Sequence, residues 1–394
     1  MGGGMTERLQ MVDWNGTVLW DYTYSNSSYN LHHDFCPLPN GNILAIAYEA
    51  KTAAEVTTAG CNISHVMWPD KIVEFQPTGT NSATIVWEWH AWDHLVQDYD
   101  ASKNNYGVVA DHPELLDINY NNTSNVKDWM HMNGIDYNPI LDQIAFSCHN
   151  LDQIFVIDHS TTTAEAASHS GGISGKGGDI LYRWGDPAHY DTPGTAILNV
   201  VHDAHWIPEG YPNAGYLVGF NNNGVSQNQS SVDLVSPPLN GFNYDWTPGS
   251  AFSPSSYTLR QTCNGHSNNM GNSEQFPNGN MMVCTAQSGT VYEINSTGTQ
   301  LWTYTANGTI NAPNDSGVDE LGSNSLRIYP NPAKEELVVV FENQGLQELT
   351  IRNLLGISVL ETRVSSGQSL LLTGLNPGVY FLNLGGEIRK LVKE

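Results

Sequence analysis

The sequence predicts an all-β chain with two modules: a six-bladed β-propeller with an incomplete first blade, followed by a small Ig-like β-sandwich. Three observations predict this fold: a repeated aromatic phrase, Asn-Gly turns between apolar strands, and a change of charge near residue 325. The 394 residues leave room for about two or three domains. No long stretch shows the periodicity of an amphipathic helix.

A short phrase, an aliphatic residue followed by alternating aromatics, recurs and predicts the blades. Its copies are Leu19–Tyr22, Val86–Trp89, Leu181–Trp184 and Leu301–Tyr304, with a weaker copy at Tyr244–Trp246. We expect each copy to be an outer strand whose aromatic side chains pack in the core. The long interval at residues 90–127 lacks a strand pattern and is expected to form a loop over one end of the ring. A stacked solenoid is the rival architecture.

Two copies of a Pro-Asn-Gly-Asn phrase, in Leu38–Leu44 and Phe276–Met282, predict hairpins. Asn-Gly between apolar alternations is a strong hairpin signal, and we expect both turn residues to take positive φ. With the spacing of the aromatic phrases, roughly 60 residues, these turns favour a propeller with long blades.

The charge divides the chain. Its net charge is −25, with 40 acidic and 15 basic residues, yet residues 326–394 hold seven of each sign. So acidic a chain cannot neutralise a run of phosphates, which excludes a nucleic-acid partner, and no apolar run is long enough to span a membrane. We therefore expect a propeller over residues 1–306, a Gly- and Asn-rich linker over 307–324 and the sandwich over 325–394.

The first residues show no signal peptide, and the cysteines show no zinc-ribbon or thioredoxin-like motif. The chain opens Met1-Gly-Gly-Gly-Met5 with no signal peptide, and we expect its start to be truncated within the first blade. The five cysteines form no Cys-x-x-Cys pair. A disulfide between Cys263 and Cys284 and buried free thiols both remain open.

Histidines stand where the expected blades begin. They are His33, His131 and His202, with His266 as a fourth candidate. The innermost strands of a propeller line its central channel, so we expect these imidazoles to converge and to act as nucleophile, acid or metal ligand. No spaced zinc motif accompanies them, so the metal interpretation is the weaker one.

The phrases around these histidines resemble the bacterial aryl-sulfate sulfotransferase family. They are His32–Asn42, Ala91–Leu95, Asp128–Tyr137, Tyr182–Pro187 and Val201–Trp206. The resemblance implies a six-bladed propeller that transfers a sulfuryl group from a phenolic sulfate ester to a phenol. It implies ping-pong kinetics, no phosphoadenosine phosphosulfate and no other cofactor.

Position by position, the resemblance implies that His202 is the histidine that becomes sulfated. His131 and Asn133 match the family's His-x-Asn sulfate ligands. His33, or else His32, matches a further channel histidine. His33 or His131 would then carry the proton of the phenol.

Two positions put the substrate in doubt. His149 stands where the family has an arginine, so a permanent cation is replaced by a group whose charge depends on pH. Arg183 is either a substitute anion ligand or a structural member of its aromatic phrase. Asp34 and Asp203, each next to a channel histidine, are expected to orient the imidazoles or cap turns rather than bind metal.

Residues 325–394 alternate in short strands and resemble the C-terminal sorting domain of type IX secretion. The phrases that carry the resemblance are Leu326–Ala333, Leu375–Leu382 and the basic tail Arg389–Lys393. It implies a Gram-negative protein that is secreted or held on the outer surface, with the type IX machinery as a partner. An adhesive or carbohydrate-binding sandwich is the alternative.

Other functions stay open at this level. The main alternative to the transferase is a secreted propeller that binds sulfated or phenolic ligands, or surface partners, without turnover. Water in place of the acceptor phenol would make a sulfatase. A quinone-dependent dehydrogenase is disfavoured, because eight tryptophan-marked blades are not visible.

Overall fold

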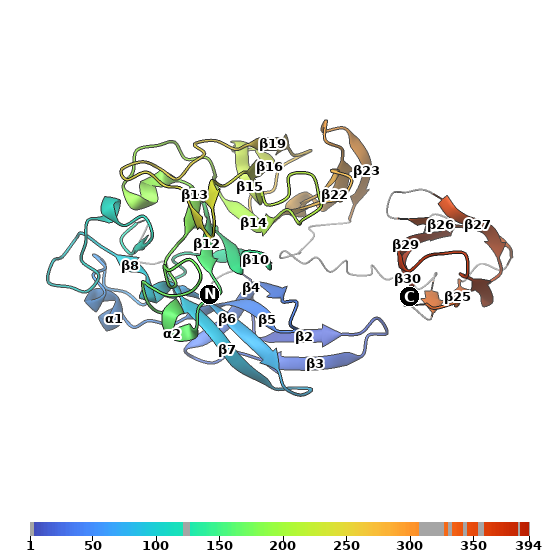
Figure 1. The fold of residues 1–394 in the computed structure, drawn as a ribbon, viewed down its shortest axis with the longest axis horizontal. Coiled ribbons are helices and arrows are strands. Elements are labelled where there is room, and N and C mark those ends of the chain that lie inside the picture. The colour runs from blue at the N-terminus through green and yellow to red at the C-terminus, as the bar shows by residue number, and fades with distance from the viewer. Residues whose placement is uncertain are drawn as a thin grey trace. The chain divides into compact units, whose positions relative to one another are not determined.

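The computed structural model is mostly β, with 47% of residues in strands and 7% in helices. It describes residues 4–120, 127–306, 327–329, 333–341, 345–353, 358–384 and 387–393. The chain forms two compact units, one of Met1–Asp13 with Thr17–Asp315 and one of Trp14–Gly16 with Ser316–Glu394 (Figure 1). The expected linker, 307–324, and part of the phrase Leu326–Ala333 lie outside the described residues.

The first unit contains four antiparallel sheets, each built from consecutive stretches of chain. The first sheet is β1 (Met5–Thr6), β4 (Tyr29–Pro37), β5 (Ile43–Glu49), β6 (Asp70–Pro77) and β7 (Ala83–His90). The second is β10 (Met132–Asn138), β11 (Gln143–Cys148), β12 (Gln153–Asp158) and β13 (Tyr182–Gly185). The third is β14 (Val201–Trp206), β15 (Leu217–Ser226), β16 (Gln229–Val235) and β19 (Leu259–Thr262). The fourth is β20 (Asn272–Gln275), β21 (Met281–Thr285), β22 (Thr290–Ile294) and β23 (Gln300–Thr305).

Smaller elements complete this unit. A two-stranded hairpin, β2 (Arg8–Val12) and β3 (Val18–Thr23), lies between β1 and β4 in the chain. Its helices are short: α1 (Ala53–Thr58), α2 (Thr163–Ala166), η1 (Ala91–Asp93), η2 (Val109–Asp111), η3 (Pro187–Tyr190) and η4 (Ala286–Ser288). Two short strand pairs are β8 (Leu95–Val96) with β9 (Leu116–Asp117), and β17 (Leu239–Asn240) with β18 (Asn243–Tyr244). The described part of the expected loop at 90–127 thus holds η1, η2 and the parallel pair β8–β9.

Four of the five aromatic phrases are edge strands, as predicted: β3, β7, β13 and β23. The expectation that their aromatics pack in the core was wrong for β23, whose Trp302 and Tyr304 are exposed. The fifth assignment was wrong. Tyr244 lies in the small hairpin, and β19 takes the outer place in the third sheet. Tyr244 is buried all the same, with its hydroxyl donating to Gln143 Oε1 at 2.8 Å, so its aromatic ring packs from a loop. The described residues of the first unit hold four sheets of four or five strands and three two-stranded pairs, and the number of blades stays a prediction.

Both Asn-Gly phrases form the expected hairpin turns, but with a different backbone. Leu38 and Phe276 each accept from the amide of the glycine three residues on, Gly41 at 3.0 Å and Gly279 at 2.8 Å. Positive φ falls on the glycines alone, 86° and 83°, and not on the preceding asparagines. The expectation of two left-handed residues per turn was therefore wrong, because the turn is one residue longer than a two-residue hairpin.

Buried aspartates join each innermost strand to the next. Asp34 Oδ2 accepts from the Ile135 amide at 2.9 Å and so ties β4 to β10. Asp136 Oδ2 accepts from Trp206 at 2.8 Å, and Asp203 Oδ2 accepts from Ser273 at 2.7 Å. These contacts continue the series through β14 to β20, and Figure 1 shows β4, β10 and β14 side by side. Asp34 and Asp203 thus connect sheets rather than cap turns.

A buried imidazolium holds two carboxylates at the edge of the first two sheets. His159 Nδ1 lies 2.7 Å from Asp142 Oδ1, and its Nε2 lies 2.9 Å from Glu74 Oε2. Burial acts to lower the pKa of His159, but the hydrogen bonds to the two carboxylates outweigh it and raise this pKa to about 9. The charge on this imidazole therefore contributes to the stability of the unit.

The cysteines carry no disulfide among the described residues. Cys36 is half-buried, and the other four cysteines, Cys263 and Cys284 among them, are buried. The interpretation as buried thiols holds, and the disulfide between those two residues was wrong.

The second unit is a sandwich of two sheets. One has β24 (Arg327–Tyr329), β25 (Glu336–Val340) and β28 (Gln368–Leu371). The other has β27 (Ser358–Val364), β26 (Gln347–Asn353), β29 (Gly378–Leu384) and β30 (Glu387–Lys393). Alternate residues such as Leu337 and Val339, and Leu349 and Ile351, point into one apolar core, as period-two strands require.

Candidate active site

Five histidines from three sheets form a continuous row. Ring centroids are 5.2 Å apart for His32 and His33, and 4.4 Å for His33 and His131. The row continues to His149 at 5.1 Å and ends at His202 after a further 5.6 Å. The expected convergence is confirmed for His33, His131 and His202, and it does not include His266. We call these three residues, together with His32 and His149, the histidine row.

The backbone that presents the row is irregular at matching places. The pairing register shifts between Leu31 and Phe35 in β4, between Met132 and Gly134 in β10, and between His202 and His205 in β14. His33 and His131 take φ of 53° and 56°. A β-bulge turns a side chain out of the regular alternation, and left-handed backbone at a non-glycine residue costs about 1 kcal/mol or more. The same distortion in consecutive sheets directs one histidine from each towards its neighbours.

His202, at one end of the row, is held as a neutral ring. Its Nδ1 lies 2.7 Å from Asn222 Oδ1, and its Nε2 accepts from the Met270 amide at 3.1 Å. Asn222 donates through Nδ2 to the carbonyls of Ser267 and Met270, both at 2.7 Å, which fixes its Oδ1 towards His202. Nδ1 must then carry the proton and Nε2 the lone pair. Burial and the neighbouring His149 hold the pKa of His202 well below its usual value.

His131 and His149 also carry their protons on Nδ1. His131 Nδ1 lies 2.5 Å from Asp128 Oδ2, an oxygen that also accepts from the Tyr48 hydroxyl at 2.9 Å. His149 Nδ1 lies 2.8 Å from Asn150 Oδ1, because Asn150 donates its amide to the Asp128 carbonyl. Burial and His131 lower the pKa of His149. In their neutral forms, both rings thus direct an Nε2 lone pair outward.

His33 has the opposite arrangement. His32 Nε2 lies 2.9 Å from Asp70 Oδ1, both fully buried, and the two Nδ1 atoms of His32 and His33 are 2.9 Å apart. Burial lowers the pKa of His32 to about 3 and raises that of Asp70 well above its usual value. These two shifts favour the proton on the Asp70 carboxyl and leave His32 Nε2 unprotonated, although the 2.9 Å contact between the two atoms is not aligned as a hydrogen bond. His32 in turn donates from Nδ1 to His33, which leaves an N–H on His33 Nε2.

Three predicted binding residues lie outside the row. Asn133 is buried and donates to the Val201 carbonyl at 2.8 Å, so it links β10 to β14. His266 Nε2 lies 3.0 Å from Asn223 Oδ1.

Arg183 is buried in the interior of the first unit. Its guanidinium donates to Gln153 Oε1 at 2.9 Å and to the carbonyls of Pro113 and Leu115 at 3.1 and 3.0 Å. Its carbon Cζ lies 4.4 Å from the ring centroid of Tyr190. Burial lowers the pKa of Arg183 to about 10. Among the described residues, no lysine or arginine makes a hydrogen bond or ion pair with the histidine row.

Sequence reasoning missed the residues that orient the row. Asp128 was inside a quoted phrase, three positions before His131, and that spacing was the available signal. Asn222 lies in the run Asn221–Asn223, in which nothing marks the middle residue. Asp70 and Tyr48 come from strands without any motif.

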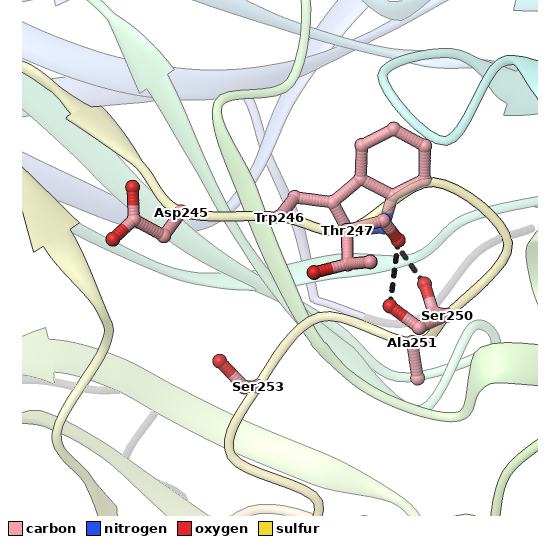
Figure 2. Close-up of a pocket in the computed structure, with 6 residues that line it drawn as sticks. All are labelled: Asp245, Trp246, Thr247, Ser250, Ala251 and Ser253. Atoms are coloured by element: carbon pink, nitrogen blue, oxygen red, sulfur yellow. Dashed lines mark hydrogen bonds between the residues drawn. The ribbon is translucent and has the colours of Figure 1, made fainter.

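A separate cavity of about 380 Å³ lies in the loop after β18. Figure 2 shows its lining: Asp245, Trp246, Thr247, Ser250, Ala251 and Ser253. The Trp246 indole donates to the Ser250 carbonyl at 2.7 Å, which closes the loop on itself. None of the predicted site residues lines it.

Residues 1–314 match the family model of arylsulfotransferase (ASST). The chain belongs to the arylsulfotransferase family. Residues 327–394 match the secretion system C-terminal sorting domain. This domain implies the type IX machinery and a secreted or cell-surface location. Within the described residues, no helix is long and apolar enough to cross a membrane.

Similarity to individual proteins is distant. No functionally curated protein matches significantly. A Bacteroides caccae protein of unknown function is 11% identical, with 77% of this chain and 78% of that chain covered and a TM-score of 0.39. PorZ, a surface component of the type IX secretion system of Porphyromonas gingivalis, is 9% identical, with 98% and 68% covered and a TM-score of 0.26. Virginiamycin B lyase from Staphylococcus aureus is 11% identical, with 67% and 70% covered and a TM-score of 0.25.

Proposed function

We propose that this arylsulfotransferase-family chain is an exported, six-bladed aryl-sulfate sulfotransferase in which His202 accepts the sulfuryl group. The observation that carries the proposal is the pair formed by His202 and Asn222. It fixes a neutral imidazole with its lone pair on Nε2, the form a nucleophile needs.

The reaction proceeds in two displacements. In the first, His202 Nε2 forms a bond to the sulfur of the aryl sulfate, the bond from sulfur to the aryl oxygen breaks, and the phenoxide leaves with a proton. In the second, a phenol loses its proton and attacks the same sulfur, and the bond between Nε2 and sulfur breaks. The Met270 amide hydrogen bond to Nε2 must open in the first step.

The neighbouring rings divide the remaining roles. His33 donates its Nε2 proton to the leaving phenoxide and takes a proton at Nδ1 from His32, which the Asp70 carboxyl reprotonates at Nε2. His131, with a lone pair on Nε2 oriented by Asp128, takes the proton of the acceptor and passes it to His33 Nε2, with ring centroids 4.4 Å apart. The proton shift from Asp70 through His32 to His33 then reverses, and all four groups return to their starting forms. His149 hydrogen-bonds a sulfonate oxygen only when it is protonated, because its neutral form directs a lone pair there. Asn133 and Arg183 hydrogen-bond to other parts of the protein, so their role is to hold the strands and loops around them rather than to bind the substrate.

A second candidate is binding of sulfated or phenolic ligands without turnover. It is favoured by the lack of a lysine or arginine contact to the row among the described residues. The two functions separate in a steady-state assay with 4-nitrophenyl sulfate and a phenol acceptor. The transferase gives nitrophenol release that rises with the acceptor and shows ping-pong kinetics, whereas release that His202→Gln leaves unchanged contradicts the proposal.

The second module concerns the export of the protein. We propose that residues 325–394 are recognised by the type IX secretion machinery, which delivers the propeller to the outer surface or the medium.

A further inference from the structure

Two histidines and an aspartate meet outside the histidine row. Asp179 Oδ1 lies 2.8 Å from His94 Nδ1 and 2.8 Å from His169 Nδ1. One donor atom from each of the three residues lies within 4.8 Å of the other two. His94 is distant in sequence from the other two residues, which are 10 positions apart, and the three match no zinc spacing motif.

Both ring nitrogens of His94 face oxygen acceptors, whereas a neutral imidazole can donate from only one of them. His94 Nε2 lies 2.8 Å from the Ala166 carbonyl, which can only accept, so Nε2 carries a proton. A neutral His94 then directs its Nδ1 lone pair at a carboxylate oxygen 2.8 Å away, which is repulsive. A cation between the two removes the repulsion. An imidazole whose other nitrogen donates to a backbone carbonyl is the usual form of a metal-binding histidine.

The backbone holds the three ligands closely together. His94 is fully buried, and its ring stacks on Trp89 with centroids 5.6 Å apart and planes at 4°. Trp89 Nε1 also donates to the Gly178 carbonyl at 2.7 Å, next to Asp179. A Cβ at Gly178 would lie 2.7 Å from His94 Nε2 and 2.0 Å from the Ala166 carbonyl oxygen, so only glycine allows this approach. The loop is thus shaped around His94.

The geometry points to a zinc site made by His94, His169 and Asp179. Two imidazole nitrogens and one carboxylate oxygen are a preferred ligand set for Zn²⁺, with bonds of roughly 2.0–2.2 Å, and tetrahedral bonds of that length need donor atoms only about 3.3 Å apart. The His169 side chain is 64% exposed, which gives the ion a path from solvent and leaves the fourth position to water. The ion would fasten the loop of residues 168–179 to His94, and it takes no part in sulfuryl transfer.

Zinc titration of the full chain tests this site. The protein is stripped with a chelator, dialysed and titrated calorimetrically with Zn²⁺ beside His169→Ala, a change at an exposed side chain that leaves the core intact. We expect the variant to bind one zinc equivalent fewer than the wild type. The histidine row is unchanged in both proteins, so any zinc that it takes up cancels in the difference.

His112→Ala is the matched control, because His112 is also exposed and pairs with a single carboxylate, Glu114, at 2.9 Å. It should keep the full number of equivalents. Co²⁺ bound in place of zinc should give tetrahedral visible absorption that is lost in His169→Ala and kept in His112→Ala. Equal zinc binding by wild type and His169→Ala, or none by the wild type, would show that the cluster is only a pair of hydrogen-bonded ion pairs.

Discussion

Replacing Asn222 by alanine tests whether one buried amide holds the nucleophile and its loop together. The side chain is fully buried and makes three hydrogen bonds of 2.7 Å, to His202 Nδ1 and to the carbonyls of Ser267 and Met270. At about 1 kcal/mol net for each hydrogen bond, the variant should lose about 3 kcal/mol of unfolding free energy. The loss is larger if the three partner atoms stay buried without water or another hydrogen bond. Turnover should fall as well, because His202 Nδ1–H loses its acceptor.

Urea unfolding followed by tryptophan fluorescence measures this loss. All 11 tryptophans lie between Trp14 and Trp302, so the signal reports on the first unit. Asn223→Ala is the control, because that neighbouring amide is only half-buried and makes two longer contacts, to Asn199 at 3.1 Å and to His266 at 3.0 Å. Its loss should cost at most about 1 kcal/mol. If Asn222→Ala is no less stable than Asn223→Ala, the reasoning about this contact is refuted.

Three further changes probe charge in the first unit. His149→Arg supplies a permanent hydrogen-bond donor, so the KM for an aryl sulfate should fall several-fold. In the wild type, the lowered pKa of His149 means that this ring is protonated only in acid, so KM should fall as the pH drops below about 6.5. A wild-type KM that stays constant or rises over this pH range opposes the assignment. Because the pKa of His159 is raised to about 9, the stabilisation by its charge is complete below about pH 6.5 and is lost as the pH rises to 9. Urea titration should show a loss of about 3 kcal/mol in unfolding free energy over this range. A His159→Gln protein whose stability has the same pH profile would contradict this. Asp128→Asn should lower kcat by about 100-fold or more with little change in KM, because His131 loses the acceptor that sets its tautomer. A rise in KM with kcat unchanged would argue against a proton-transfer role for His131.

The sequence predicted the parts of the fold that depend on local patterns. The alternation of Glu336–Val340 and the aromatic phrase in β7 mark strands, because the alternation of buried and exposed side chains in a strand appears directly in the local sequence. Tyr244 misled because an aromatic side chain can fill the same core from a loop as from an edge strand. The Asn-Gly turns were placed correctly but not their φ values, since loop length is set by the strand pairing on either side.

The site could be predicted only in part, for a related reason. Histidines before innermost strands converge because the sheets repeat, so His131 and His202 were accessible to sequence reasoning. The partners of His202 and His32 were not, since Asn222 and Asp70 come from neighbouring strands without a motif. They act by setting which ring nitrogen carries the proton. Asn133 matched a family motif, yet its amide is turned to the Val201 carbonyl, an orientation that a motif does not encode.

The most direct test of the account is intact-mass spectrometry of the full chain after brief mixing with 4-nitrophenyl sulfate in the absence of acceptor. The account predicts that the protein gains the mass of one sulfuryl group, that the gain maps to His202, and that a phenol removes it. His202→Gln should show no gain. An unmodified wild-type protein, or a gain that persists in His202→Gln, would contradict the proposal that this imidazole carries the sulfuryl group.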